Sequence, residues 1–159
     1  MKRIRELIWG LISLLLIVSC SACKSVEEEP ENLVTKTSYE ILASTIYETT
    51  VYVFTSNLPG PTVMIVGGIH GDEIAGWQVA QTLVTKDDYR GKVIIIPKAN
   101  ILATTLQKRY PGQETKGVYQ GISYSDLNRV FPGKIDGTIT EQIAYAIIEE
   151  VEKYQPDYI

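Results

Sequence analysis

The chain has 159 residues, 45% of them hydrophobic, which suffices for the core of one domain rather than two. With 15 basic and 19 acidic residues its formal net charge is −4, so the chain does not belong to the class of strongly basic proteins that bind nucleic acid. Both cysteines lie within the first 23 residues, so a disulfide framework in the rest of the chain is excluded as well.

The N-terminus has the pattern of an export signal. Basic residues among the first five positions precede an almost wholly apolar run over residues 7–18, which is short for a membrane span. The sequence Ile17-Val18-Ser19-Cys20 resembles the lipobox of bacterial lipoproteins, in which the cysteine is lipidated and becomes the new N-terminus. We therefore expect a signal peptide over residues 1–19 and an extracytoplasmic, membrane-anchored lipoprotein with its lipid on Cys20. Cys23 is the second candidate.

A polar stretch separates this signal from the folded part. Removal of residues 1–19 leaves 12 basic and 18 acidic residues, a net charge of −6. Residues 20–32 are acidic and lack aromatic side chains, which is typical of a solvated tether. The domain itself is expected to span residues 33–159.

Four strands are predicted in the first half of the domain. Residues 35–41 and 47–55 are rich in β-branched and aromatic residues, and both are interpreted as strands at a sheet edge. Residues 62–66 and 93–96 are continuous apolar runs, which predict strands buried on both faces.

Two helices complete the predicted fold. Asp72 can cap a helix over residues 73–84, and its place between the two buried strands implies a right-handed parallel crossover. Thr138 and Glu141 form a potential capping box for a helix over residues 140–154 with an apolar stripe. The predicted fold class is therefore α/β, with a mixed, largely parallel twisted sheet and flanking helices.

The remaining segments have weaker patterns. Residues 98–134 contain many turn formers and little periodicity, so we expect a long loop, and loops of this length inside a domain are usually functional. Residues 157–159 are interpreted as the beginning of a further strand.

A candidate metal pair follows the first buried strand. His70, the only histidine, lies three residues before Glu73 in a glycine-rich turn, and residues three apart on a turn entering a helix can converge on one ion. An imidazole and a carboxylate suit zinc. Open α/β sheets bind ligands beyond the carboxyl ends of their strands, where this turn lies. Alternatively, His70 is a structural residue and Glu73 favours the helix N-terminus.

A second candidate site is the sequence Asp126-Leu127-Asn128-Arg129. The planar guanidinium of an arginine can bind a carboxylate through two parallel hydrogen bonds, and an asparagine amide can add another donor. Asn128 and Arg129 are therefore candidates for binding a substrate carboxylate. A solvated surface arginine is the alternative, and Asp126 is expected to brace the pair rather than to touch substrate.

Together the two motifs resemble a known family. The sequence Gly67-Gly68-Ile69-His70-Gly71-Asp72-Glu73, followed by Asp126-Leu127-Asn128-Arg129-Val130-Phe131-Pro132-Gly133, is similar to the succinylglutamate desuccinylase and aspartoacylase family, relatives of the zinc carboxypeptidases. The resemblance covers roughly residues 61–159 and corresponds to the N-terminal part of the family's catalytic domain. It implies a zinc carboxypeptidase-like fold and hydrolysis of an amide bond in a carboxylate-bearing substrate.

The resemblance also implies roles for individual residues. His70 and Glu73 would hold one zinc ion with water at its open position, and Asn128 and Arg129 would bind the carboxylate of the substrate. Arg109, in a stretch similar to the family segment that supplies an arginine, would polarise the scissile carbonyl. The expected partners are a small molecule or peptide with a free carboxylate and, through the lipid, a membrane.

The chain departs from the family pattern near its end. The family's third ligand is a histidine after the strand that would begin at residues 157–159, and its proton-accepting glutamate comes later; neither has a counterpart here. Catalytic zinc typically has three protein ligands plus water. We therefore expect either a fragment of a longer hydrolase, inactive by itself, or a decayed relative that binds metal weakly. A non-enzymatic solute-binding lipoprotein with a vestigial metal site is the alternative function.

Overall fold

The computed structural model describes residues 29–110, 118–119, 122–123 and 126–159. The chain divides into residues 1–31 and a folded unit over residues 32–159. The predicted signal peptide and the candidate lipidation sites Cys20 and Cys23 lie outside the described residues. No helix within the described ranges is both long enough and apolar enough to span a bilayer.

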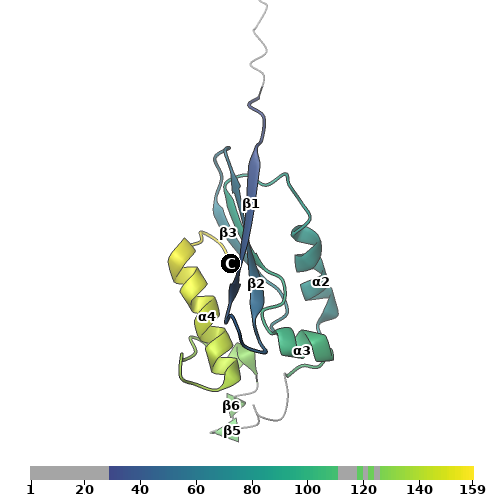
Figure 1. Cartoon of the computed structure of the whole chain (residues 1–159), viewed down its shortest axis with the longest axis vertical. Coiled ribbons are helices and arrows are strands. Elements are labelled where there is room, and N and C mark those ends of the chain that lie inside the picture. The colour runs from purple at the N-terminus through teal and green to yellow at the C-terminus, as the bar shows by residue number, and fades with distance from the viewer. Residues whose placement is uncertain (1–28, 111–117, 120–121, 124–125) are drawn as a thin grey trace, which may run out of the picture. The chain divides into compact units, whose positions relative to one another are not determined.

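The folded unit is built on a four-stranded sheet (Figure 1). Its strands are β1 (Val34–Ile41), β2 (Thr49–Ser56), β3 (Thr62–Val66) and β4 (Lys92–Ile96), in the order β1-β2-β4-β3. β2 is antiparallel to both β1 and β4, whereas β3 and β4 are parallel. The sheet is therefore mixed but mostly antiparallel, and the prediction of a largely parallel sheet is wrong.

The error comes from the first hairpin. Both of its strands were expected at an edge, but β2 lies between β1 and β4 in the interior of the sheet. β-branched and aromatic residues favour any pleated, half-buried position, so composition does not distinguish an interior strand from an edge strand. Val51 and Phe54 of β2 are almost fully buried, in keeping with its interior place.

Helices cover both faces of the sheet (Figure 1). α4 (Ile139–Tyr154) lies on one face, and α2 (Ile74–Leu83) and α3 (Ile101–Leu106) lie on the other. Ile94 and Ile96 of β4 pack in the core with α4, whereas Val93 and Ile95 pack with Ala80 of α2. β4 is thus buried on both faces, as its continuous apolar run predicts.

The helix between β3 and β4 begins one residue later than predicted, and its cap differs. Glu73 occupies the N-cap position and no side chain caps the helix through a hydrogen bond, so the prediction that Asp72 caps it is wrong. The carboxylate of Glu73 contacts His70 instead. The parallel crossover of β3, α2 and β4 is confirmed.

α4 agrees closely with its prediction. Thr138 Oγ1 accepts a hydrogen bond from the Glu141 amide (3.3 Å), and the Glu141 carboxylate accepts one from the Thr138 amide (2.8 Å), which completes the capping box. After α4, Tyr158 forms a parallel bridge with Val63 of β3, and its carbonyl accepts a hydrogen bond from the Met64 amide (2.9 Å). The strand expected at residues 157–159 therefore pairs with β3.

The segment between β4 and α4 contains more regular structure than predicted. α3 begins after Asn100, whose Oδ1 accepts a hydrogen bond from the Ala103 amide (3.2 Å). The 3-10 helix η1 (Leu127–Arg129) follows, and β5 (Val118–Tyr119) pairs antiparallel with β6 (Ile122–Ser123). Each of these elements has six residues or fewer, which is too short for hydrophobic periodicity to reveal.

Candidate metal site

The turn after β3 is fixed by backbone hydrogen bonds to the segment after β4. The amides of Ala99 and Asn100 donate to the carbonyls of Gly67 (2.8 Å) and Gly68 (3.0 Å). Gly68 has a φ of 73°, in the left-handed region that favours glycine. The chain can therefore turn sharply at the end of the strand and place His70 just beyond the sheet.

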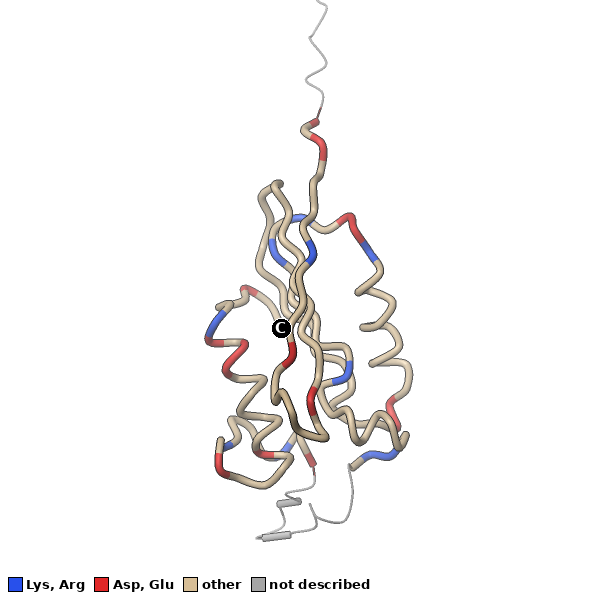
Figure 2. The backbone as a smooth tube through the Cα atoms, in the orientation of Figure 1, with Lys and Arg blue, Asp and Glu red and all other residues tan. Residues whose placement is uncertain are grey.

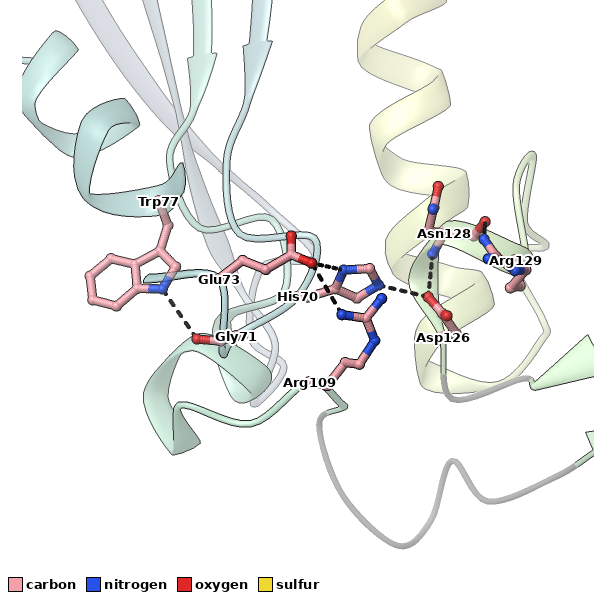
Figure 3. A network of polar contacts seen from close by, with 8 residues as sticks. All are labelled: His70, Gly71, Glu73, Trp77, Arg109, Asp126, Asn128 and Arg129. Carbon is pink, nitrogen blue, oxygen red and sulfur yellow. Dashed lines mark hydrogen bonds and ion pairs between the residues drawn. The ribbon is translucent and has the colours of Figure 1, made fainter. Parts of the chain in front are cut away.

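His70 lies between two carboxylates (Figure 3). Its Nδ1 is 2.9 Å from Glu73 Oε1, and its Nε2 is 2.9 Å from Asp126 Oδ1. The side chains of His70 and Asp126 are 6% and 8% exposed, whereas the Glu73 side chain is 59% exposed. The sequence pair His70 and Glu73 is thus brought together, with Glu73 on the solvent side of the ring and Asp126 on the buried side.

The contact between Asp126 and His70 was not predicted. Asp126 precedes η1, and its Oδ1 also accepts a hydrogen bond from the Asn128 amide (3.0 Å). The carboxylate therefore braces the turn that carries Asn128 and contacts the imidazole at the same time. Because 56 residues separate Asp126 from His70, no local spacing could have indicated this contact.

Hydrogen bonds favour the ionised form of both carboxyl groups. The hydrogen bond to His70, reinforced by that from Arg109, holds the pKa of Glu73 below its ordinary value. Burial raises the pKa of Asp126, but the hydrogen bonds to His70 and from the Asn128 amide outweigh it, so the pKa of Asp126 is also lowered. Two carboxylates of this kind favour a cation, or a ring N–H, between them.

Arg109 completes the cluster on its exposed side. Its Nη1 donates to Glu73 Oε1 at 3.1 Å, and its side chain is 43% exposed (Figure 3). Partial burial opposes its charge, but hydrogen bonds to Glu73 and Tyr110 and the attraction of Asp72 hold the pKa of Arg109 above its ordinary value. Arg109 therefore lies beside the candidate metal pair.

Two further contacts secure the His70 turn. The amide of Gly71 donates to the carbonyl of Lys108 (3.1 Å), and the indole N–H of Trp77 donates to the carbonyl of Gly71 (3.3 Å). Trp77 is 8% exposed, and Lys98 Nζ lies 4.6 Å from the centroid of its ring. Trp77 is thus a packing residue.

Asn128 and Arg129 lie on the other side of Asp126. Both side chains are exposed, and Arg129 Nη1 donates to the carbonyl of Asn128 (3.0 Å). In Figure 3, both residues lie on the Asp126 side of the contact between His70 and Asp126. The structure therefore places this pair next to the metal pair in space, joined to it through Asp126.

The donor set meets part of what a zinc ion requires. Two ligands of a tetrahedral zinc ion lie about 3.3 Å apart, so Nδ1 of His70 and Oε1 of Glu73 would separate by a few tenths of an ångström to share one ion. Asp126 contacts the opposite nitrogen, the arrangement in which a carboxylate orients a ligating histidine. Within the described ranges, no group of three or more His, Cys, Asp or Glu side chains is arranged to hold a metal ion. The chain thus offers two donors and an orienting carboxylate.

The fold is a mixed sheet with helices on both faces, which makes this an α/β protein. Its enzyme-like polar site consists of a histidine, a glutamate and an arginine that gather beyond the end of β3. The chain belongs to the succinylglutamate desuccinylase/aspartoacylase family, because residues 59–155, more than half of its length, match the Succinylglutamate desuccinylase/Aspartoacylase catalytic domain. This is a family of deacylases and desuccinylases, which hydrolyse amide bonds. The resemblance found in the sequence is confirmed.

Individual relatives agree with this assignment. The chain is 41% identical over 88 residues to the N-alpha-acetyl-L-2,4-diaminobutyric acid deacetylase of Halomonas elongata. It is similar to the crystal structure of a succinylglutamate desuccinylase from a Silicibacter species (27% identity, TM-score 0.59) and to the product-bound ectoine utilization protein EutE from Ruegeria pomeroyi (28%, TM-score 0.59). An aspartoacylase family protein from Mesorhizobium loti is similar as well (28%, TM-score 0.60).

The similarity covers only part of each relative. The match to the deacetylase takes in 54% of this chain and 23% of the relative. The first two structures each align with 80% of this chain and 39% of their own length, and the third with 80% and 38%. The chain therefore spans about two fifths of the solved relatives that it matches.

Proposed function

We propose that this chain is part of a zinc-dependent hydrolase that cleaves an amide bond in a carboxylate-bearing substrate. The proposal rests on the 2.9 Å contact between His70 Nδ1 and Glu73 Oε1, two donors suited to zinc, in a member of a deacylase family. A third ligand and a proton-accepting glutamate, together with the rest of a zinc carboxypeptidase-like sheet, would come from outside these 159 residues.

Each residue of the cluster then has a chemical role. In the metal-bound form, Asp126 would accept the N–H of His70 Nε2 and leave the Nδ1 lone pair for an ion shared with the Glu73 carboxylate. When bound there, zinc would supply an activated water, with a pKa lowered toward ~7, as the nucleophile. Arg109 would donate to the carbonyl oxygen as negative charge develops on it. Asn128 and Arg129 would bind the carboxylate of the substrate.

The substrate class is proposed as N-acyl amino acids. The name of the Halomonas elongata relative, an N-alpha-acetyl-L-2,4-diaminobutyric acid deacetylase, supports this class. The export signal and the lipobox-like sequence ending at Cys20 support the further proposal that the domain acts outside the cytoplasm on a lipid anchor.

The test is release of acetate from N-acetyl-2,4-diaminobutyrate by the protein produced from its native gene, in zinc-containing buffer. We expect turnover by the wild type and a loss of about a hundredfold or more in His70→Ala, because a site that loses its imidazole no longer holds the ion in place. Equal rates in the two proteins would contradict the proposal. A wild type that binds small carboxylates but hydrolyses none would favour the solute-binding alternative.

A further inference from the structure

Two side-chain nitrogens contact one oxygen of Glu73. His70 Nδ1 is 2.9 Å and Arg109 Nη1 is 3.1 Å from the same atom, Oε1 (Figure 3). Oε1 is the carboxylate oxygen in contact with Nδ1 of His70, and therefore the one placed to share an ion with that nitrogen. A metal ion at this point and the guanidinium of Arg109 would be two positive charges at a single carboxylate.

The backbone keeps Arg109 within reach of Glu73. The amide of Gly71 donates to the carbonyl of Lys108, so the residue before Arg109 is fixed to the His70 turn (3.1 Å). The two segments are packed tightly, because a Cβ added at Gly71 would lie 1.8 Å from the carbonyl oxygen of Ala103 and 2.5 Å from that of Lys108. The guanidinium is thus held near Glu73 as a tethered group at high effective concentration.

We propose that Arg109 competes with the metal ion for Glu73, so that the metal and the guanidinium occupy this carboxylate alternately. This inference depends on the proposed function, since it takes the pair His70 and Glu73 as the metal site. Metal binding weakens the ion pair between Glu73 and Arg109. By thermodynamic linkage, the ion pair lowers the affinity for the metal by the same factor. Occupation of the metal site therefore shifts Arg109 away from Glu73 and toward substrate by that factor.

The size of the effect follows from the exposure of the ion pair. The two side chains are 43% and 59% exposed, and ion pairs of this kind are worth less than about 1 kcal/mol. Removal of the guanidinium is therefore expected to tighten zinc binding about two- to fivefold, the equivalent of about 0.4–1 kcal/mol. Because the charges are exposed, the factor should decrease toward one in about 1 M salt, where the Debye length is about 3 Å.

The experiment follows the single imidazole of the chain by NMR. In the full chain labelled with 15N-histidine, the ring resonances belong to His70 alone, since it is the only histidine. Cys20 and Cys23 would also bind zinc, so both are replaced by serine in every protein compared. Zinc dissociation constants are measured for the wild-type site and for Arg109→Ala and Arg109→Gln, with Lys108→Ala as the matched control that removes a neighbouring exposed cation.

The outcomes separate this inference from the proposed function. We expect both Arg109 variants to bind zinc two- to fivefold more tightly at low salt, and Lys108→Ala to bind like the wild type. Affinity that is unchanged or weaker in both Arg109 variants overturns the inference and leaves the metal site standing. Equal tightening in Lys108→Ala also overturns it, since any nearby cation would then suffice. If zinc does not perturb the wild-type imidazole, both proposals fail.

Discussion

A single imidazole connects three distant segments of the chain. His70 comes from the turn after β3, Asp126 from the residue before η1, and Arg109 reaches the same cluster through Glu73. A neutral imidazole donates from only one of its nitrogens. With the proton on Nε2 facing Asp126, the Nδ1 lone pair is left for a metal ion. Asp126 is therefore expected to favour the tautomer of His70 that can bind a metal ion.

The change Asp126→Asn tests this dependence. An asparagine keeps one hydrogen-bonding oxygen but loses the charge that favours a proton on Nε2, so zinc affinity at His70 should fall by about ten- to a hundredfold. Zinc titration followed on the His70 ring measures the change. Asp136→Asn, an exposed carboxylate outside the cluster, is the control and should bind like the wild type. Unchanged affinity in Asp126→Asn would show that the contact does not orient the ring.

The sequence could predict part of this site. The spacing of His70 and Glu73 is local, and a turn at the end of a buried strand brings residues three apart together. The contact with Asp126 depends on how η1 folds back onto the sheet, which no local pattern encodes. The attachment of Arg109 to Glu73 likewise depends on the packing of α3 against Gly71. Tertiary contacts of this kind are not predicted by local sequence patterns and are seen only in the structure.

At the scale of elements, α4 is held to the edge strand β1 by a polar cluster. The Tyr39 hydroxyl donates to the carboxylate of Glu150, which is 6% exposed, and lies 3.1 Å from the Tyr154 hydroxyl. Lys153 Nζ donates to the Tyr39 oxygen (2.6 Å) and is 3.4 Å from Glu150 Oε2. A buried carboxylate requires such partners, so Tyr39 is expected to stabilise the contact between β1 and α4.

The change Tyr39→Phe should lower the free energy of unfolding by about 1–3 kcal/mol, because Glu150 loses a hydrogen-bond donor while it stays buried. Urea denaturation at pH 7 measures the loss. Tyr47→Phe is the matched control: its hydroxyl donates to the neutral amide of Gln142 on α4 (2.9 Å), and its loss should cost no more than about 1.5 kcal/mol. Equal losses of unfolding free energy in the two variants would show that the charge of Glu150 does not strengthen its hydrogen bond with Tyr39.

The same cluster predicts a dependence on alkaline pH. Burial, followed by the hydrogen bonds to Glu150 and Tyr154, raises the pKa of Tyr39 well above its ordinary value. A raised pKa in the folded state contributes stability that is fully present below about pH 10 and is lost as the pH rises further. The wild type should therefore lose more stability than Tyr39→Phe between about pH 9 and pH 11. Parallel curves for the two proteins would contradict this.

The elements differ in how well their sequences predict them. The apolar runs of β3 and β4 and the capping box of α4 are strong local signals, and all three elements are present. β3 was expected to be buried on both faces, but it lies at the edge of the four-stranded sheet and only Met64 is buried. Strand order is a tertiary property, and the antiparallel pairing of β2 with β4 reversed the predicted character of the sheet. Glu73 was expected inside α2, but it occupies the N-cap position. Its carboxylate contacts His70 and does not cap the helix.

At the scale of the whole molecule, the class of binding partner and the lipid anchor remain predictions. Acidic and basic residues are interspersed along the described backbone (Figure 2), and the net charge without residues 1–19 is −6. Proteins that bind nucleic acid concentrate basic residues on one face, so a partner of that class remains unexpected. A small anionic substrate needs only a local cation, and Arg109 and Arg129 lie on either side of the contact between His70 and Asp126.

The lipid anchor is tested by Cys20→Ser. In a bacterial host given radiolabelled palmitate, the wild type should incorporate label and sediment with membranes, and the variant should lose nearly all of the label. Two acyl chains are needed for stable anchoring, so the variant should also leave the membrane fraction unless its signal sequence is retained uncleaved. Cys23→Ser is the control and should be labelled like the wild type. Loss of label in Cys23→Ser alone would move the anchor to Cys23.

The central claim is that one metal ion is shared by Nδ1 of His70 and the carboxylate of Glu73. The most direct measurement is the 15N spectrum of the single imidazole during zinc addition to the full chain with both cysteines replaced. We expect the Nδ1 resonance to shift on metal binding, Nε2 to keep its proton toward Asp126, and Glu73→Gln to weaken the response. Zinc bound at Nε2, or an imidazole that does not respond to zinc, would contradict it.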